Sequence, residues 1–258
     1  MRNLRLRVVV GLAVALLLVA STAWAQRATG GGGTAPGEWV IMTYVPENNY
    51  SVPVALPVTK IKGNGVSFDF YSTPDRAVLL YDMRQDKQFR PGKLVGRSLR
   101  ARVAINASVG AQFVYFNNDG TGTLQGGWAD PGGFVRLYFQ GVNPDLVGCE
   151  SGWDPSRPDC EAQYWWSNPL HIDLNDLAAL GAKGITLEAL LSPENWSDRD
   201  GHMGDFDANH LAWFNAAVAN ATKMGLSFGG NGWWAFGCGF DETTASSANF
   251  VLSQWVVK

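Results

Sequence analysis

The stretch SLRARVAI, residues 98–105, decides the expected fold, because its hydrophobic residues recur at every second position. Its odd-numbered positions, from Leu99 to Ile105, are all apolar, whereas Arg100 and Arg102 occupy two of the even-numbered positions. Successive side chains of a β-strand point to opposite faces of its sheet. The stretch therefore predicts a strand with one buried face and one solvent face.

The same alternation returns along most of the chain. Residues 134–139 (FVRLYF) and 184–191 (GITLEALL) repeat it, and turn clusters rich in Gly, Asn, Asp and Pro separate such segments. Only 17% of the residues are charged and 30 are glycine, which favours short strands and turns over long amphipathic helices. We therefore predict an all-β domain built as a two-sheet sandwich. Further strands are expected at residues 39–45, 66–70, 77–83, 111–116, 164–174, 224–229, 233–238 and 249–257.

One segment departs from this pattern. Between residues 208 and 223 the apolar side chains recur at helical spacing. Asp205 and Asp207 precede it, at positions where carboxylates cap a helix and complement its dipole. We expect one short helix that ends by Gly225 and covers one end of the sandwich.

The first 25 residues have the features of a cleavable export signal. Three arginines lie within residues 2–7, an apolar run follows over residues 8–20, and Ala23 and Ala25 form an Ala-x-Ala cleavage site. The run is shorter than the roughly 20 residues that a membrane-spanning helix needs, although an uncleaved anchor is the alternative. We expect a secreted or periplasmic protein that begins at Gln26. A flexible Gly-rich leader over 26–37 and one β-sandwich domain over 38–258 complete the expected organisation.

The charge of the expected mature chain excludes some partners. Removal of the three signal arginines leaves 17 Lys and Arg against 23 Asp and Glu, a formal net charge of −6. No basic cluster remains to bind a phosphate backbone, which makes nucleic acid an unsuitable partner. No second long apolar stretch is present, so we expect no membrane insertion.

Three cysteines give one expected disulfide and one thiol left over. Cys149 and Cys160 bracket a segment of turn-forming residues, and an oxidising compartment would allow a disulfide between them. Cys238 lies among aromatic residues and is interpreted as a small buried apolar side chain. No histidine lies near it in the sequence, which argues against a catalytic cysteine.

Several fold-like stretches, spread over most of residues 38–258, together carry a resemblance to a known family. They are LVGRSLRARV (94–103), VRLYFQ (135–140), YWWSNP (164–169), ITL (185–187), SPENWS (192–197), KMGLSFGG (223–230) and NFVL (249–252). Together they resemble the galactose-binding-like jelly roll of carbohydrate-binding modules and of uncharacterised secreted bacterial proteins. The resemblance implies a two-sheet jelly-roll sandwich and, more weakly, glycan binding; fold alone does not determine function.

The supply of tryptophan, 11 residues, exceeds what a sandwich core needs. Sugar rings stack on indoles through their C–H faces, and their hydroxyl groups bind amides. Adjacent tryptophans in a strand point to opposite faces, so at most one of each pair is expected in the core. Loops that bury the second indole are the alternative to a sugar platform. The predicted ligand-binding residues are Trp165, Trp166, Asn168, Asn231, Trp233 and Trp234.

The loop 198–207 gathers four carboxylates and could hold a structural calcium ion, although its spacing does not match an EF-hand. The simpler interpretation is a solvated loop whose last acids serve the helix that follows. His171, His202 and His210 are scattered in the sequence. We therefore predict no metal ligands and no cofactor.

For an enzyme, Glu188 and Glu194 are the carboxylates that could serve glycoside hydrolysis, but the sequence does not pair them across a cleft. The favoured hypothesis is a secreted, non-catalytic binding module for a glycan or a cell-surface polysaccharide. The alternatives are an extracellular structural or adhesive protein with buried tryptophans, and a small glycoside hydrolase.

Overall fold

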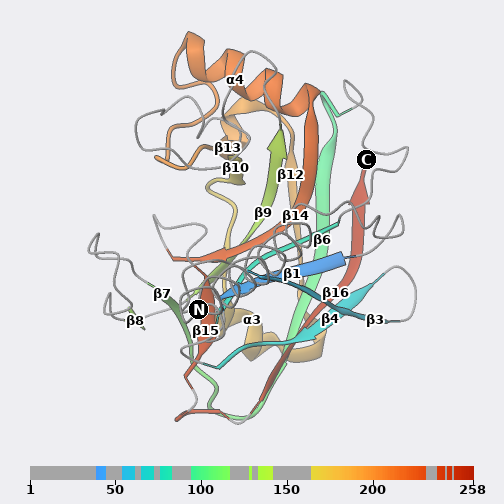
Figure 1. Ribbon diagram of the computed structural model, residues 1–258, viewed down its shortest axis with the longest axis vertical. Coiled ribbons are helices and arrows are strands. Elements are labelled where there is room, and N and C mark those ends of the chain that lie inside the picture. The colour runs from blue at the N-terminus through green and yellow to red at the C-terminus, as the bar shows by residue number, and fades with distance from the viewer. Residues whose placement is uncertain are drawn as a thin grey trace, which may run out of the picture. The chain divides into compact units, whose positions relative to one another are not determined.

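Two antiparallel β-sheets make up most of the regular structure in the computed structural model (Figure 1). The larger sheet has eleven strands, of which eight follow the order β13-β10-β9-β14-β5-β15-β7-β8; β1 pairs with β2 and β5, and β11 pairs with β9. The smaller sheet has five strands in the order β12-β6-β16-β4-β3. The structure describes residues 39–44, 54–61, 65–72, 76–82, 94–116, 128–129, 133–141, 164–230, 237–241, 243–245 and 247–258, all within one compact unit, Pro36–Lys258.

The strand bounds are as follows. The larger sheet contains β1 (Trp39–Tyr44), β2 (Val54–Pro57), β5 (Arg76–Asp82), β7 (Phe113–Phe116), β8 (Trp128–Ala129), β9 (Phe134–Gly141), β10 (Tyr164–Ser167), β11 (Ile172–Asp173), β13 (Trp196–Ser197), β14 (Ala221–Gly229) and β15 (Cys238–Phe240). The smaller sheet contains β3 (Thr59–Lys60), β4 (Val66–Asp69), β6 (Ser98–Ala107), β12 (Ile185–Leu190) and β16 (Ala248–Val257).

Strand β6 confirms the alternation of residues 98–105. The side chains of Leu99, Val103 and Ile105 are fully buried, whereas Arg102 is exposed. β6 pairs with β12 on one side and with β16 on the other, so it is an inner strand of the smaller sheet. Apolar side chains recur at every second position of β6 because only one face of this sheet meets the core.

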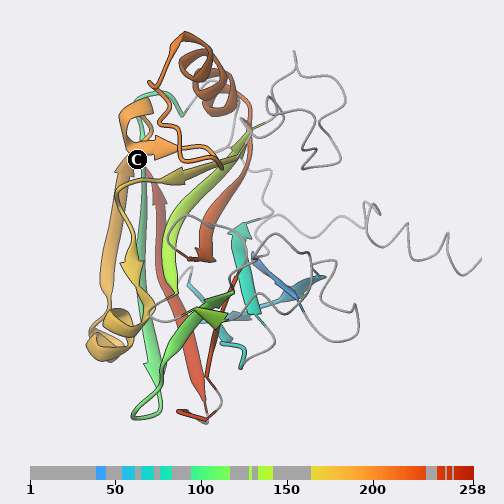
Figure 2. The ribbon, with the colours of Figure 1, turned by 90° about the vertical axis from the view of Figure 1, so that its left-hand side faces the viewer.

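The two sheets face each other across one hydrophobic core, which confirms an all-β two-sheet sandwich. The view in Figure 2 shows the long strands β6, β12 and β16 beside β9 and β14 of the larger sheet. Aromatic rings join the layers: Phe68 and Phe250 of the smaller sheet stack at 5.4 Å, and both contact the ring of Phe228 on β14 edge to face. Such edge-to-face pairs add to the stabilisation that comes from burying the rings.

The predicted helix is present as α4 (Ala208–Ala219), at one end of the sandwich (top of Figure 1). Asp207 caps it, because its carboxylate accepts the backbone N–H of His210 at 2.8 Å. The helix is shorter than predicted: it stops at Ala219, and residues up to Gly229 form β14. Pairing of β14 with β9 overrides the helical spacing of residues 220–223.

A second short helix corrects the prediction of one helix and of a continuous strand over 164–174. β10 ends at Ser167, and after the two-residue β11 the chain forms α3 (Leu174–Leu180), followed by the 3-10 turn η3 (Gly181–Lys183). Pro169 has no N–H to continue a ladder. The carboxylate of Asp173 accepts the N–H of Asn175 and caps α3, which buries Leu174 and Leu177.

The structure tests only some of the predictions for residues 233–238, for the three cysteines and for membrane insertion. β15 begins at Cys238, whereas residues 233–236 of the predicted strand lie outside the described residues. Cys238 is fully buried with a free thiol, as interpreted, and its burial raises the pKa of the thiol. Cys149 and Cys160, the predicted disulfide, also lie outside the described residues, as do residues 1–38. Within the described part of the chain, no helix combines the length and the apolar character needed to cross a membrane.

Candidate functional site

The adjacent tryptophans of β10 point to opposite sides of the larger sheet. Trp165 pairs with Phe139 of β9 and is 0% exposed. Its ring meets the ring of Phe214 from α4 edge to face, with 5.0 Å between centroids. Trp165 therefore belongs to the core, where no sugar ring can stack on it.

Trp166 lies on the outer side of the sheet, opposite the core. Its ring is 5.5 Å from the ring of Tyr138 and stacks on that of Tyr164 at 6.3 Å. We call the outward-facing side chains of Arg136, Tyr138, Gln140, Tyr164, Trp166 and Lys223 the outer aromatic face. Trp166 is 3% exposed and Tyr138 is 1% exposed, whereas Tyr164 is only partly buried. Tyr164 is thus the most accessible of the three rings.

Two basic side chains accompany these rings. The guanidinium of Arg136 is buried and donates a hydrogen bond to the carbonyl of Ser167 at 3.3 Å; its burial lowers the pKa to about 9. The ammonium of Lys223 lies 5.3 Å from the ring centroid of Tyr81, and burial lowers the pKa of Lys223. Outward faces of antiparallel sheets normally carry solvated polar side chains, so this combination of rings with a buried guanidinium and a half-buried ammonium is unusual.

One hydrogen-bond donor on this face stands out. The Nε1 atom of Trp166 is buried and has no hydrogen-bond partner among the described residues. The buried indole of Trp196, by contrast, donates its Nε1 proton to the carbonyl of Leu190 at 2.7 Å. A buried donor without an acceptor costs free energy, which an incoming oxygen atom can offset.

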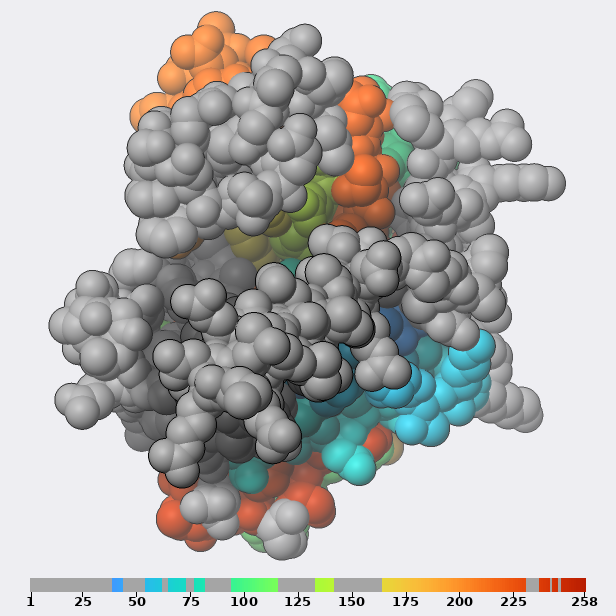
Figure 3. Space-filling view, viewed as in Figure 1, coloured from blue at the N-terminus to red at the C-terminus, as the bar shows by residue number. Residues whose placement is uncertain are grey.

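The other predicted ligand-binding residues either have a protein partner away from the outer aromatic face or lie outside the described residues. The amide of Asn168 follows β10 and donates to the hydroxyl oxygen of Ser197 at 3.3 Å, so it already has a protein partner. Asn231, Trp233 and Trp234 lie outside the described residues. In the space-filling view of Figure 3, atoms of β9, β10 and β14 are visible between the grey segments (yellow-green to orange).

Glu188 and Glu194, the two carboxylates considered for glycoside hydrolysis, lie in different parts of the structure and have different partners. Glu188 on β12 forms ion pairs with Lys258 at 2.8 Å and with Arg100 at 3.8 Å. Glu194, in the 3-10 turn η4 (Pro193–Asn195), is exposed and accepts a hydrogen bond from Ser192, which lowers the pKa of its carboxyl group. A general acid needs a raised pKa, so Glu194 does not fit that role.

A third group of polar side chains lies beneath α4. Asp198 follows β13, His202 ends the tight turn after it, and His210 lies in the first turn of α4. One ligand atom from each of these three residues lies within 4.8 Å of the others. We call Asp198, His202 and His210 the histidine–aspartate cluster. Its donor atoms are those that bind transition metals.

The sequence prediction missed this cluster, because it treated the three histidines as scattered. The turn is made by Gly201, whose φ of +85° lies in the left-handed region, and it brings His202 back beside Asp198. The capped first turn of α4 then places Nε2 of His210 at 3.4 Å from Oδ2 of Asp198. The only sequence signal was the position of both histidines within or just after the acidic loop 198–207.

Comparisons with protein families, with curated proteins and with solved structures found no match for this chain. The resemblance to galactose-binding-like domains therefore stays a prediction.

Proposed function

We propose that this chain is a secreted or periplasmic, non-catalytic module that binds carbohydrate on the outer aromatic face of its larger sheet. The observation that carries the proposal is the composition of this face: three aromatic rings lie together with one buried and one half-buried cation where a sandwich normally presents solvated side chains. The export signal expected over residues 1–25 supports an extracellular or periplasmic ligand.

Three groups of this face match parts of a sugar, two of them partly exposed and one buried. The ring of Tyr164 offers an apolar surface for the C–H face of a pyranose. The amide of Gln140, on the neighbouring strand, accepts a hydrogen bond from the hydroxyl of Tyr138 at 3.2 Å through Oε1 and offers its NH₂ group as a donor. The orphaned Nε1 proton of Trp166 would be satisfied by a sugar oxygen.

The cations favour an acidic sugar. Lys223 is half-buried, and no carboxylate among the described residues forms an ion pair with it. A half-buried ammonium gains more from an anionic partner than a fully solvated one does, because water screens the interaction less. We therefore expect polysaccharides that contain uronic acids to bind more tightly than neutral ones of the same linkage.

The test is a titration of the purified protein with neutral and acidic polysaccharides, followed by intrinsic fluorescence and by calorimetry. Tyr164→Ala should abolish stacking and weaken binding at least about 10-fold, whereas Tyr164→Phe, which keeps the ring, should bind nearly as well. Trp166→Phe keeps the stack and removes the orphaned donor, so a loss of about 5- to 10-fold is expected.

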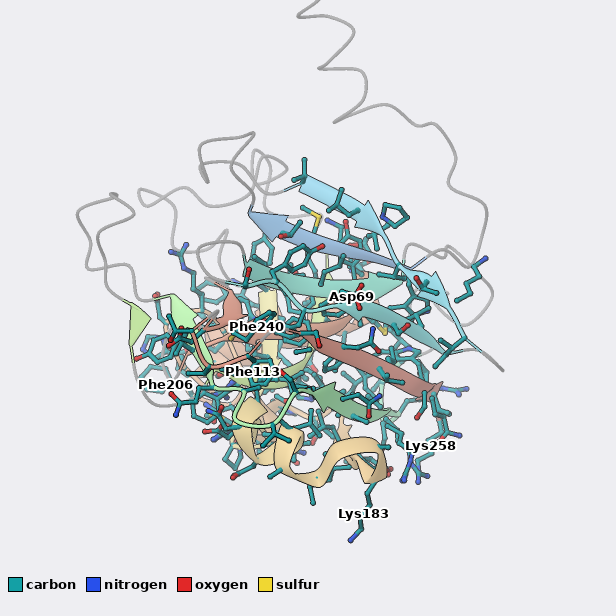
Figure 4. All side chains as sticks on the ribbon, turned by 90° about the horizontal axis from the view of Figure 1, so that it is seen from below. Asp69, Phe113, Lys183, Phe206, Phe240 and Lys258 are labelled. Atoms are coloured by element: carbon teal, nitrogen blue, oxygen red, sulfur yellow. The ribbon has the colours of Figure 1, made fainter. Side chains whose placement is uncertain are left out.

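A matched pair of lysines tests the charge preference. Lys223→Met should remove the preference for acidic polysaccharides, while Lys183→Met, at an exposed lysine whose side chain points away from the fold in Figure 4, should leave it unchanged. Binding that is equal in both variants would contradict the role of Lys223.

A second candidate, a structural protein with internal tryptophans, is favoured by a different observation. The side chains of Trp39, Trp165, Trp166 and Trp196 are all buried. If every polysaccharide in the panel leaves the fluorescence unchanged, and acrylamide quenches the native emission only weakly, this second function is the better one.

A further inference from the structure

We infer that Asp198, His202 and His210 form a binding site for one divalent transition-metal ion of the Zn²⁺ class. This site is distinct from the outer aromatic face, and neither depends on the other. The inference rests on the spacing of the ligand atoms, on the orientation of His210 and on the partners of a buried carboxylate.

The spacing is close to that of a tetrahedral site. The Oδ2 atom of Asp198 lies 3.4 Å from Nε2 of His210 and 3.8 Å from Nδ1 of His202. Ligand atoms bound at 2.0–2.2 Å to a tetrahedral Zn²⁺ ion lie about 3.4 Å apart. One ligand atom from each of the three residues lies within 4.8 Å of the other two, so the separations in the structure approach those of a bound ion.

The imidazole of His210 is oriented so that the lone pair of its Nε2 atom faces the carboxylate of Asp198. Nδ1 of His210 lies 2.7 Å from Oδ1 of Asp207, so this nitrogen holds the proton that it donates to Asp207. In the neutral ring, Nε2 is then an acceptor, and it faces Oδ2 of Asp198, which is also an acceptor. A cation between them turns this repulsion into two bonds. A carboxylate that holds the far nitrogen of a metal-bound histidine is the usual arrangement at such sites.

The side chain of Asp198 is 7% exposed. Its Oδ1 atom accepts the backbone N–H of His202 at 2.9 Å, which leaves Oδ2 directed at the two imidazoles. Among the described residues, only these histidines lie within ion-pair distance of Asp198. A buried carboxylate needs a cationic partner, and a divalent ion would supply it.

Neighbouring aromatic side chains hold the two imidazole rings in place and leave one side of the histidine–aspartate cluster open to solvent. The ring of Phe206 lies 4.5 Å from that of His202 and 5.2 Å from that of His210, and the ring of Trp213 lies 5.0 Å from that of His210. Phe206 is itself 62% exposed and labelled at the edge of the molecule in Figure 4. His202 is partly exposed, so a fourth position can be taken by water or by an external ligand.

The donor set selects the class of ion. Calcium prefers six to eight oxygen ligands, whereas two imidazole nitrogens and one carboxylate suit zinc and the neighbouring transition metals. The calcium ion considered from the carboxylates of loop 198–207 is therefore a poorer match than Zn²⁺ for this cluster.

The experiment is a titration of the purified full chain, stripped with a chelator and dialysed, with Zn²⁺ alone in competition with a chromogenic chelator. We expect one saturable equivalent of Zn²⁺ per chain, and Co²⁺ in its place should give the intense visible bands of a tetrahedral site. His202→Ala, at a partly exposed position, should weaken binding at least about 100-fold, because even an indirect partner of a ligand is worth 10- to 100-fold. Asp198→Asn should do the same.

Two controls and the contrary results complete the design. His171→Ala removes a histidine elsewhere in the chain, and Asp200→Asn removes an exposed carboxylate of the same loop; both should keep the wild-type affinity. The inference is overturned if the wild-type chain binds less than one equivalent. It is also overturned if His202→Ala binds as tightly as wild type, or if Ca²⁺ competes equally with Zn²⁺.

Discussion

Asp207 contacts two groups of one residue, His210, through a single oxygen atom. Its Oδ1 atom accepts the backbone N–H of His210 at 2.8 Å, which caps α4, and lies 2.7 Å from the Nδ1 atom of the same residue, which orients the imidazole. Both contacts lower the pKa of Asp207. The cap is a property of the helix, whereas the contact with Nδ1 matters only for what Nε2 can bind, so substitution can separate the two roles.

We predict that Asp207→Ser keeps the cap and loses the orientation of His210. Serine caps a helix about as well as aspartate, but it is too short to reach Nδ1. The affinity for Zn²⁺ should fall about 10- to 100-fold, while the thermal midpoint of the metal-free protein stays close to that of wild type. Zn²⁺ titration and circular dichroism on the same samples check this. A variant that loses stability without losing affinity would leave Asp207 with the capping role alone.

Tyr138 should make the stability of the fold depend on alkaline pH. Burial raises the pKa of its phenol well above the ordinary value of 10.0, with smaller contributions from Tyr164 and Tyr81. Above about pH 10 the unfolded chain releases this proton and the folded chain keeps it. The stability that depends on the proton is therefore fully present below pH 10 and is lost as pH rises.

The measurement is urea unfolding of wild type and of Tyr138→Phe between pH 8 and pH 11. The free energy of unfolding of wild type should fall relative to that of the variant above about pH 10, by up to about 1.4 kcal/mol per pH unit. Below about pH 9 the difference between the two should not change with pH. Parallel curves across the whole range would show that the phenol titrates freely.

At the scale of elements, α4 packs against the sandwich through Phe214, Ala217 and Val218, and Phe214 is the largest of these side chains. Phe214 contacts the rings of Trp165 and Phe139 at 5.0 and 5.8 Å, and it is almost fully buried. Gly204 lies so close to this ring that an added Cβ would approach it to 2.9 Å. The turn that carries His202 is thus packed against the same side chain that docks the helix.

We predict that Phe214→Ala destabilises the fold by about 3–5 kcal/mol, the usual cost of removing a buried aromatic ring. Leu211→Ala on the same helix, at a side chain that is exposed, should change stability by less than about 1 kcal/mol. Chemical unfolding of both variants checks this. A small effect of Phe214→Ala would mean that other contacts dock α4.

Particular elements show what the sequence could predict. β6 and the start of α4 were predictable because alternation and a capping carboxylate are local signals. The opposite directions of Trp165 and Trp166 followed from the same alternation. The end of α4 was not predictable, since the pairing of β14 with β9 outweighs helical spacing. The histidine–aspartate cluster depends on a left-handed glycine and on the docking of α4, which are properties of the folded chain.

At the scale of the whole molecule, the core takes its residues from one continuous part of the chain. The buried cluster begins at Trp39 and ends at Leu252, and the compact unit that contains it spans Pro36–Lys258. The last strand, β16, pairs with both β4 and β6, so early and late segments meet within one sheet. Because the two sheets share one core, we expect them to fold and unfold together.

We therefore predict that a chain beginning at Pro36 unfolds in one cooperative transition, at the same urea midpoint as a chain beginning at Gln26. Every residue of the described core is retained in both, so the surface buried on folding, which sets the urea dependence, should not change. Fluorescence and far-UV circular dichroism should give coincident curves for the two chains. A lower midpoint for the shorter chain would show that residues 26–35 contribute to the stability of the sandwich, and two separate transitions would show that the sheets do not form one cooperative unit.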